Sequence, residues 1–94
     1  MALSDYSRKV DGVKKRGLLI FTLSTCVWCK KTKKLLKDLG LEYSYIDVDL
    51  VSENAKEEVL KEFSRWNPDH SFPTVVVDNK RCIIGFREDE LRRL

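Results

Sequence analysis

Residues 18–40 of the chain read LLIFTLSTCVWCKKTKKLLKDLG, and this stretch decides the fold class. Its first part, Leu18–Leu23, is almost entirely apolar, which is typical of a central strand that is covered on both faces. In Val27–Leu39, apolar residues recur mainly on one side of a helix and lysines occupy the rest. The sequence therefore predicts a strand followed directly by an amphipathic helix, with Cys26 and Cys29 at the junction.

A Cys-x-x-Cys pair at the start of a helix suits dithiol redox chemistry. Unpaired backbone N–H groups and the positive end of the helix dipole stabilise a thiolate at this position. Cys29 lies one helical turn after Cys26 and within its reach. We therefore expect Cys26 to attack a disulfide and Cys29 to resolve the mixed disulfide. Thr25 and Lys30 flank the pair and are expected to stabilise the thiolate.

The remaining sequence continues the alternation of strands and helices. Strands are expected at Glu42–Val48, Thr74–Val77 and Arg81–Ile84, helices at Ser52–Phe63 and Glu88–Leu94, and a hairpin turn at Asp78-Asn79. The order strand, helix, strand, helix, strand, strand, helix predicts an α/β fold in which a four-stranded mixed sheet has helices on both faces. The charged residues 1–16 are expected to form a flexible or short-helical lead-in to a domain that spans residues 17–94.

Composition limits the classes of function. Ninety-four residues, of which 43% are hydrophobic, suffice for one core. The net charge of +3 is spread along the chain, so nucleic acid is not an expected partner. No apolar stretch approaches the roughly 20 residues that span a bilayer, and residues 1–16 are charged where a signal peptide is apolar. We expect a soluble, cytoplasmic monomer that does not contact membranes.

Three stretches resemble the glutaredoxin branch of the thioredoxin-fold proteins, and the resemblance covers roughly residues 17–94. Ser24–Cys29 resembles the active-site turn of glutaredoxins, Ser71–Thr74 their cis-proline loop, and Gly85–Asp89 their terminal glycine turn. In these proteins the cis-proline faces the active-site disulfide. The resemblance implies a thioredoxin/glutaredoxin fold with substrate-binding roles for Val27, Trp28, Phe72, Pro73, Gly85 and Phe86.

Two positions favour one group within this family. Leu23 stands where glutaredoxins usually have a lysine that binds the carboxylate of glutathione, and Phe86 stands where their Gly-Gly turn lets glutathione approach. Cys-Val-x-Cys followed by Gly-Phe-Arg-x-Asp is similar to the NrdH-type redoxins, which thioredoxin reductase reduces. The resemblance implies a thiol–disulfide oxidoreductase that reduces protein disulfides through Cys26 and Cys29, takes electrons from a disulfide reductase protein and needs no bound cofactor.

Two alternative functions remain open. Glutathione as electron donor or substrate would make the protein a glutathione-dependent glutaredoxin. A zinc or iron–sulfur module would need further ligands, for which Cys82 and His70 are the candidates. Structural zinc sites usually present two paired cysteine or histidine knuckles, and Cys82 and His70 are isolated in the sequence. We therefore expect no metal, and we expect Cys82 to be a strand thiol without a role.

Overall fold

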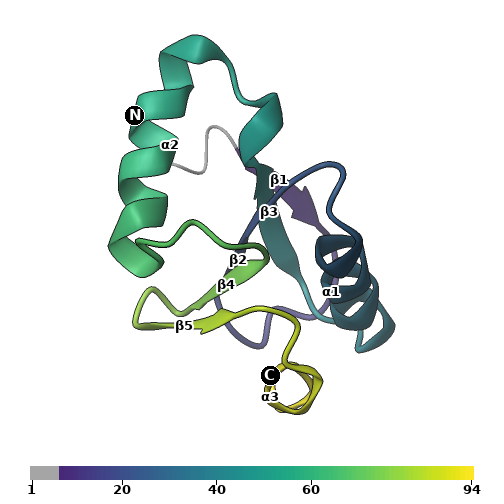
Figure 1. Cartoon of the computed structure of the whole chain (residues 1–94). Coiled ribbons are helices and arrows are strands. Elements are labelled where there is room, and N and C mark those ends of the chain that lie inside the picture. Colours follow the sequence, from purple (N-terminus) through teal and green to yellow (C-terminus); the bar gives the residue numbers. More distant parts are fainter. Residues whose placement is uncertain (1–6) are drawn as a thin grey trace.

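One mixed sheet of five strands forms the centre of the described part of the chain, residues 7–94, in this computed structural model (Figure 1). The strands are β1 (Arg8–Val10), β2 (Leu18–Thr22), β3 (Tyr43–Asp47), β4 (Thr74–Val77) and β5 (Arg81–Ile84). Their order across the sheet is β1-β3-β2-β4-β5, with β2 and β3 parallel and all other neighbours antiparallel. The α/β class is confirmed, but the predicted count of four strands is one too low.

The additional strand is β1, which lies within the predicted lead-in. Arg8 pairs with Tyr45 and Val10 with Tyr43, so β1 extends the sheet beyond β3. The backbone N–H of Val13 then donates to the carbonyl of Gly40 at 2.8 Å. The prediction of a flexible or short-helical lead-in is therefore wrong for residues 8–10, and its first six residues lie outside the described part. Charged residues are typical of an edge strand, so the sequence of β1 has no apolar pattern from which a strand could be predicted.

Helices cover both faces of the sheet, as predicted (Figure 1). The helices α1 (Val27–Asp38) and α3 (Glu88–Arg92) share one core with the sheet, and α2 (Glu53–Trp66) shares the other. The first core includes Ile20, Leu35, Leu36, Val75, Leu91 and Leu94, and the second includes Phe21, Ile46, Val48, Val59, Phe63 and Val76. Successive residues of β2 point to opposite faces, so the apolar residues 18–21 of this strand supply both cores.

The helix α1 has defined signals at both ends. Cys26 is its N-cap residue. At the other end Gly40 has a φ of 73°, and its N–H donates to the carbonyl of Lys37 at 2.9 Å. The N–H of Leu41 donates to the carbonyl of Leu36 at 3.1 Å, which completes a Schellman motif. The chain thus turns directly from α1 toward β3.

The hairpin between β4 and β5 holds the second half of the sheet in register. Asp78 and Asn79 have φ angles of 53° and 55°, which confirms the turn predicted there, and Lys80 completes the connection between the paired Val77 and Arg81. The side chain of Asp78 also accepts a hydrogen bond of 2.7 Å from the N–H of Gly17, just before β2.

Of the helices that the structure describes, none is both long and apolar enough to cross a membrane.

Replacing Gly12 by alanine tests whether the segment after β1 packs on the domain. A Cβ at Gly12 would lie 2.6 Å from the carbonyl carbon of Leu41 and 2.8 Å from the nitrogen of Glu42, both backbone atoms. We expect Gly12→Ala to lower the free energy of unfolding by about 1–3 kcal/mol, as overpacking does. Thermal unfolding measures this as a lower melting temperature, by about 4–8 °C per kcal/mol.

Gly17→Ala is the matched control, because the nearest atom to its Cβ would be the Asp78 carboxylate oxygen at 3.6 Å, an ordinary contact. Equal melting temperatures for the two variants would contradict the packing of residues 8–16 against the α1–β3 connection.

Candidate active site

Cys26 and Cys29 lie at the first turn of α1, where β2 leads into the helix. The backbone N–H of Cys29 donates to the Sγ of Cys26, with nitrogen and sulfur 3.2 Å apart. Cys26 is half-buried and Cys29 is fully buried, and both are free thiols. The pair is therefore asymmetric, since Cys26 meets solvent and receives a hydrogen bond from the helix start.

Burial is the main reason that Cys29 holds its proton. It raises the pKa of the Cys29 thiol to about 12, and the hydrogen bond with Cys26 acts in the same direction. The positive charge of Lys33, one turn further along α1, acts in the opposite direction. Cys29 is thus a thiol at neutral pH, and of the two sulfurs only that of Cys26 lies in a residue that meets solvent.

Four of the predicted substrate-binding residues surround one hollow. Trp28, Phe72, Gly85 and Phe86 line a hollow of about 190 Å³. The rings of Trp28 and Phe86 are in contact, with their centroids 5.5 Å apart. Trp28 is 52% exposed, and the neighbouring Val27 is 61% exposed. An apolar surface therefore adjoins the start of α1, although the sequence separates its parts by more than 40 residues.

The proline loop and the terminal glycine turn are tied together. The Phe72–Pro73 peptide bond is cis, as the resemblance implies. The N–H of Gly85 donates to the carbonyl of Pro73 at 2.8 Å. Gly85 has a φ of 84°, a conformation that favours glycine, and apart from its two chain neighbours no residue comes within 4 Å of a Cβ built on it. This hydrogen bond fixes Phe72 and Phe86 on adjacent sides of the hollow.

Asn67, at the end of α2, holds the proline loop in place through its side chain, a role that sequence reasoning missed. Its side chain is buried and its Nδ2 donates to the Oγ of Ser71 at 2.9 Å and to the Oγ1 of Thr74 at 3.0 Å. The same Nδ2 also lies 3.2 Å from the carbonyl oxygen of Ser71. The Asn-Pro pair at the end of α2 signals a turn, but it does not reveal contacts across the loop.

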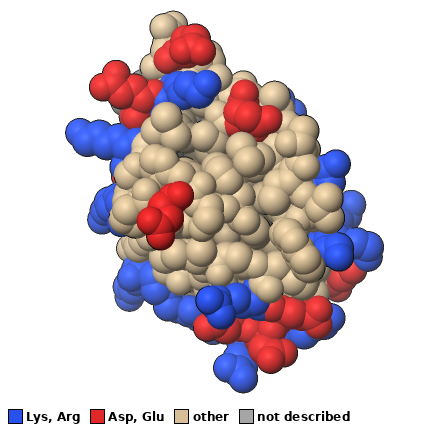
Figure 2. All heavy atoms as spheres, viewed as in Figure 1, with Lys and Arg blue, Asp and Glu red and all other residues tan. Residues whose placement is uncertain are grey.

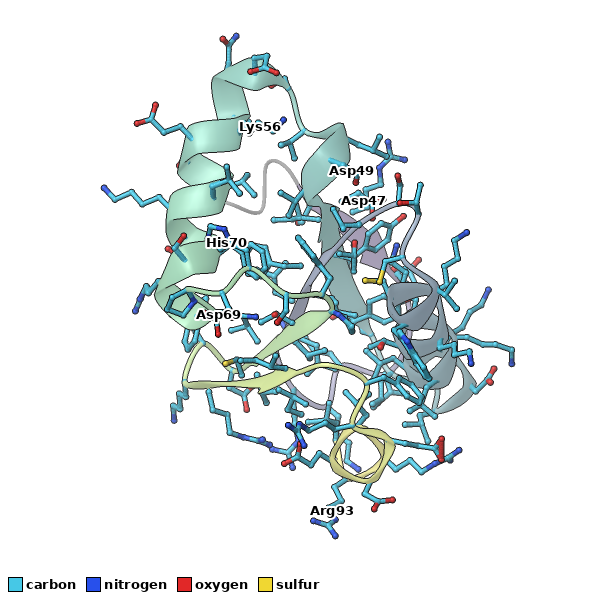
Figure 3. The ribbon with its side chains drawn as sticks, in the orientation of Figure 1. Asp47, Asp49, Lys56, Asp69, His70 and Arg93 are labelled. Carbon is cyan, nitrogen blue, oxygen red and sulfur yellow. The ribbon has the colours of Figure 1, made fainter. Side chains whose placement is uncertain are left out.

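Two aspartates, one at the last position of β3 and one shortly after it, also hold the active-site segment, and the sequence did not reveal them. The carboxylate of Asp49 accepts hydrogen bonds from the N–H and the hydroxyl of Ser24, which lower the pKa of Asp49. Asp47 accepts from Thr22 and pairs with Lys33 at 3.3 Å. Figure 3 shows both carboxylates at the end of β3 that faces the start of α1. They link the loop before Cys26 to the neighbouring strand.

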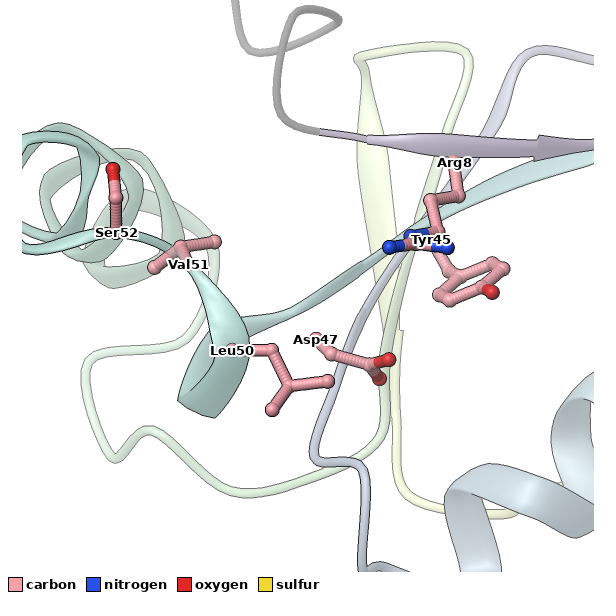
Figure 4. A pocket seen from close by; sticks show the side chains of 6 residues that line it. All are labelled: Arg8, Tyr45, Asp47, Leu50, Val51 and Ser52. Carbon is pink, nitrogen blue, oxygen red and sulfur yellow. The ribbon is translucent and has the colours of Figure 1, made fainter.

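Asp47 also lines a second hollow, of about 220 Å³, which contains neither cysteine of the pair. Figure 4 shows Arg8, Tyr45 and Asp47 on one side of it and the segment from Leu50 to Ser52 on the other. Since its lining is separate from the residues around Trp28, this hollow is not part of the candidate active site.

The remaining predicted residues take different positions. Thr25 and Lys30 are exposed on either side of the cysteine pair, and their effect on the thiolate stays a prediction. Cys82 lies on β5, where its thiol donates to the carbonyl of Trp66 at 3.4 Å. The ring of His70 stacks on Phe63, with centroids 5.0 Å apart. Within residues 7–94, no three metal-ligating side chains come together, so Cys82 and His70 do not form a cluster with the pair.

Alkylation of the reduced protein tests the asymmetry of the two thiols. The pKa of about 12 for Cys29, against an ordinary value of 9.0, makes its thiolate fraction near neutral pH about 1,000-fold smaller than that of an ordinary thiol. With limiting iodoacetamide we expect the first label of the pair on Cys26. Labelling of Cys29 should remain slow until the pH approaches 12, since the thiol keeps its proton below that value.

Peptide mass mapping locates the label, and the urea-unfolded protein serves as the control, because Cys29 is then neither buried nor bonded to Cys26. Equal initial labelling of Cys26 and Cys29 in the folded protein would contradict this account of the pair.

Comparisons with known proteins agree with the fold. Residues 18–82 match the protein-family model described as Glutaredoxin. The solved glutaredoxin of Methanosarcina mazei Go1 is 45% identical, with a TM-score of 0.84 over 95% of this chain and 86% of that one. Methanoredoxin of Methanosarcina acetivorans is 46% identical, with a TM-score of 0.83 over 87% of this chain and 86% of that one.

A more distant similarity reaches the NrdH-type redoxins. The solved NrdH-redoxin of Escherichia coli is 27% identical, with a TM-score of 0.66 over 82% of this chain and 92% of that one. The family model covers more than half of the chain, including both cysteines of the pair. The chain therefore belongs to the glutaredoxin family and is an NrdH-like redox protein of the thioredoxin fold.

Proposed function

We propose that the protein reduces disulfides in other proteins through the dithiol of Cys26 and Cys29, with a disulfide reductase protein as its electron donor. The observation that carries this proposal is the position of the half-buried Cys26 two residues before Trp28, which lines an apolar hollow, with Cys29 fully buried one turn further along. The membership in the glutaredoxin family supports thiol–disulfide exchange as the reaction class. The redox couple is the protein's own dithiol, so the proposed reaction requires no bound cofactor.

The reaction transfers two electrons in two exchange steps. The Cys26 thiolate attacks one sulfur of the substrate disulfide, the substrate S–S bond breaks, and the released substrate thiolate takes a proton from solvent. Cys29 then loses its proton and attacks the Sγ of Cys26. The mixed disulfide breaks, the second substrate thiol leaves, and the protein retains a Cys26–Cys29 disulfide. The substrate is reduced by two electrons and the protein is oxidised by two.

The geometry of the pair suits this order of events. In the dithiol, burial and the neighbouring Cys26 keep the proton on Cys29. Once Cys26 is bonded to a substrate sulfur, its contribution to the high pKa of Cys29 is removed, while the positive charge of Lys33 still favours the thiolate. Cys29 therefore becomes easier to deprotonate at the stage in which it has to attack.

The hollow beside Cys26 favours a protein substrate. Exposed aromatic side chains are enriched in protein interfaces, and Trp28 and Phe86 form such a surface together with Phe72. An extended segment that flanks the substrate disulfide would lie along Phe72, in the manner of an added strand. An apolar side chain next to the substrate cysteine would then fill the hollow.

A reductase protein is proposed as donor because two features of a glutathione site are altered. Leu23 provides no positive charge for a glutathione carboxylate. Phe86 packs on Trp28 and occupies part of the surface beside Gly85. The similar NrdH-redoxin of Escherichia coli is described as having a thioredoxin-like activity profile. We propose a thioredoxin reductase-like donor and a monomer that works in the reducing cytoplasm.

One observation favours glutathione as the second candidate donor. Gly85 lines the hollow, and apart from its two chain neighbours no residue comes within 4 Å of a Cβ built on it, which leaves room for a tripeptide backbone beside it. Under this alternative Phe86 would move away from Trp28 when glutathione binds.

A comparison of two electron donors tests the proposed function. We expect the protein to reduce a disulfide-bridged peptide at a measurable rate with NADPH and thioredoxin reductase, and at least about tenfold more slowly with glutathione and glutathione reductase. Phe86→Gly should raise the rate with glutathione by about tenfold, which corresponds to about 1.4 kcal/mol of improved binding. Consumption of NADPH at 340 nm measures both rates.

Phe86→Leu is the matched control, since it keeps an apolar side chain over Gly85 and should leave the slow glutathione rate unchanged. Efficient reduction of the parent protein by glutathione would overturn the proposed donor, and absence of peptide reduction with either donor would overturn the proposed function.

A further inference from the structure

The lysines of α1 form a stripe that begins at the active site. Lys30, Lys34 and Lys37 follow Cys26 at steps of four, four and three residues, which places them on one side of the helix. All three side chains are exposed. At a rise of about 1.5 Å per residue, the stripe extends for about 16 Å from Cys26. We call these three residues the lysine stripe.

The positive charge of α1 is only partly offset. The helix carries five lysines and one acidic residue, Asp38, which pairs with Lys34 at 2.8 Å. A second lysine, Lys33, pairs with Asp47. Lys30 and Lys37 have no ion pair among the residues that the structure describes. An excess of positive charge therefore lies beside Cys26.

The other two helices of the described chain differ in this respect. In α2 the exposed side mixes acidic and basic residues, including an Arg65–Glu62 pair at 3.2 Å. In α3 the acidic residues of the first turn are balanced by arginines, and the Nε of Arg92 lies 3.1 Å from a carboxylate oxygen of Glu88. Figure 2 shows lysine and arginine atoms along the edge of the molecule where α1 lies in Figure 1. A helix that is only solvated would show the mixed pattern of α2 and α3.

We propose that the lysine stripe binds an acidic segment that adjoins the disulfide of the partner protein. This inference rests on the proposed function and specifies the class of partner. The apolar hollow lies on one side of Cys26 and takes the residue next to the partner cysteine, while the stripe lies along α1 and takes carboxylates. A stripe of about 16 Å matches about five extended residues, at roughly 3.3 Å per residue.

The expected effect of the stripe is faster association with an acidic partner. Opposite charges steer two proteins together and can raise association rates by factors of about 10–1,000. Because the three lysines are exposed, salt screens the attraction: the Debye length is about 30 Å at 0.01 M salt and about 3 Å at 1 M. The protein should therefore associate much faster with an acidic partner than with a basic one at low salt, and this difference in rate should be small at high salt.

Two synthetic peptides provide the test. Both contain the same internal disulfide and differ only in five flanking residues, which are glutamates in one peptide and lysines in the other. At about 0.01 M salt we expect the reduced protein to react at least about tenfold faster with the glutamate peptide, a ratio that falls toward about one at 1 M salt. Stopped-flow fluorescence of Trp28 follows the reaction.

Variants separate the stripe from general charge effects. Lys34→Gln combined with Lys37→Gln should remove most of the preference, whereas Lys56→Gln combined with Lys61→Gln on α2 should keep it. Bis(2-hydroxyethyl) disulfide, which has no charge, should react equally with all three proteins, which shows that the dithiol is intact. Equal rates for the two peptides, or the same preference in the Lys34/Lys37 variant, would overturn the proposal. Failure to reduce either peptide would overturn the proposed function as well.

Discussion

The packing of one side of α1 against the sheet determines which sulfur meets solvent. Cys29, Thr32 and Leu36 lie on the buried side of the helix and are fully buried. Cys26 precedes the first turn and stays partly exposed. The same packing explains the high pKa of Cys29, because burial is its main cause. One helix orientation thus makes the two thiols of a symmetric sequence motif unequal, which is what the proposed attacking and resolving roles require.

The surroundings of Cys26 follow from the same arrangement. The side of α1 opposite its buried residues carries the lysines, and its first turn places Trp28 against Phe86. The hydrogen bond from Gly85 to Pro73 then brings Phe72 to the other side of the hollow. An apolar hollow and a positive helix therefore both adjoin the start of α1, where the half-buried Cys26 lies. This combination is why we favour a protein partner of defined charge.

The sequence predicted the parts whose signals are local. The β2–α1 junction, the Asp78-Asn79 turn and the end of α1 near Leu39 each depend on residues that are close together in the chain, and the structure confirms them. The strand β1 was missed because three residues, two of them charged, carry no alternating pattern. Its pairing with β3 depends on residues more than 30 positions away.

The supporting residues of the site could not be predicted for a related reason. Asp49 holds Ser24 across a separation of 25 residues, and Asn67, at the end of α2, contacts Thr74 at the start of β4. Polar residues in such positions look like ordinary turn residues in the sequence. The aromatic residues of the hollow were predicted only through the resemblance, since spacing alone does not bring Trp28 and Phe86 together.

Trapping of a mixed disulfide tests the central claim, that Cys26 attacks and Cys29 resolves. Cys29→Ser and Cys26→Ser variants are each incubated with a disulfide-bridged peptide, and mass spectrometry of the intact and digested protein locates any adduct. The account predicts a stable peptide adduct on Cys26 in Cys29→Ser and no comparable adduct in Cys26→Ser. An adduct on Cys29 or Cys82 that forms as fast in the Cys26→Ser variant would contradict it.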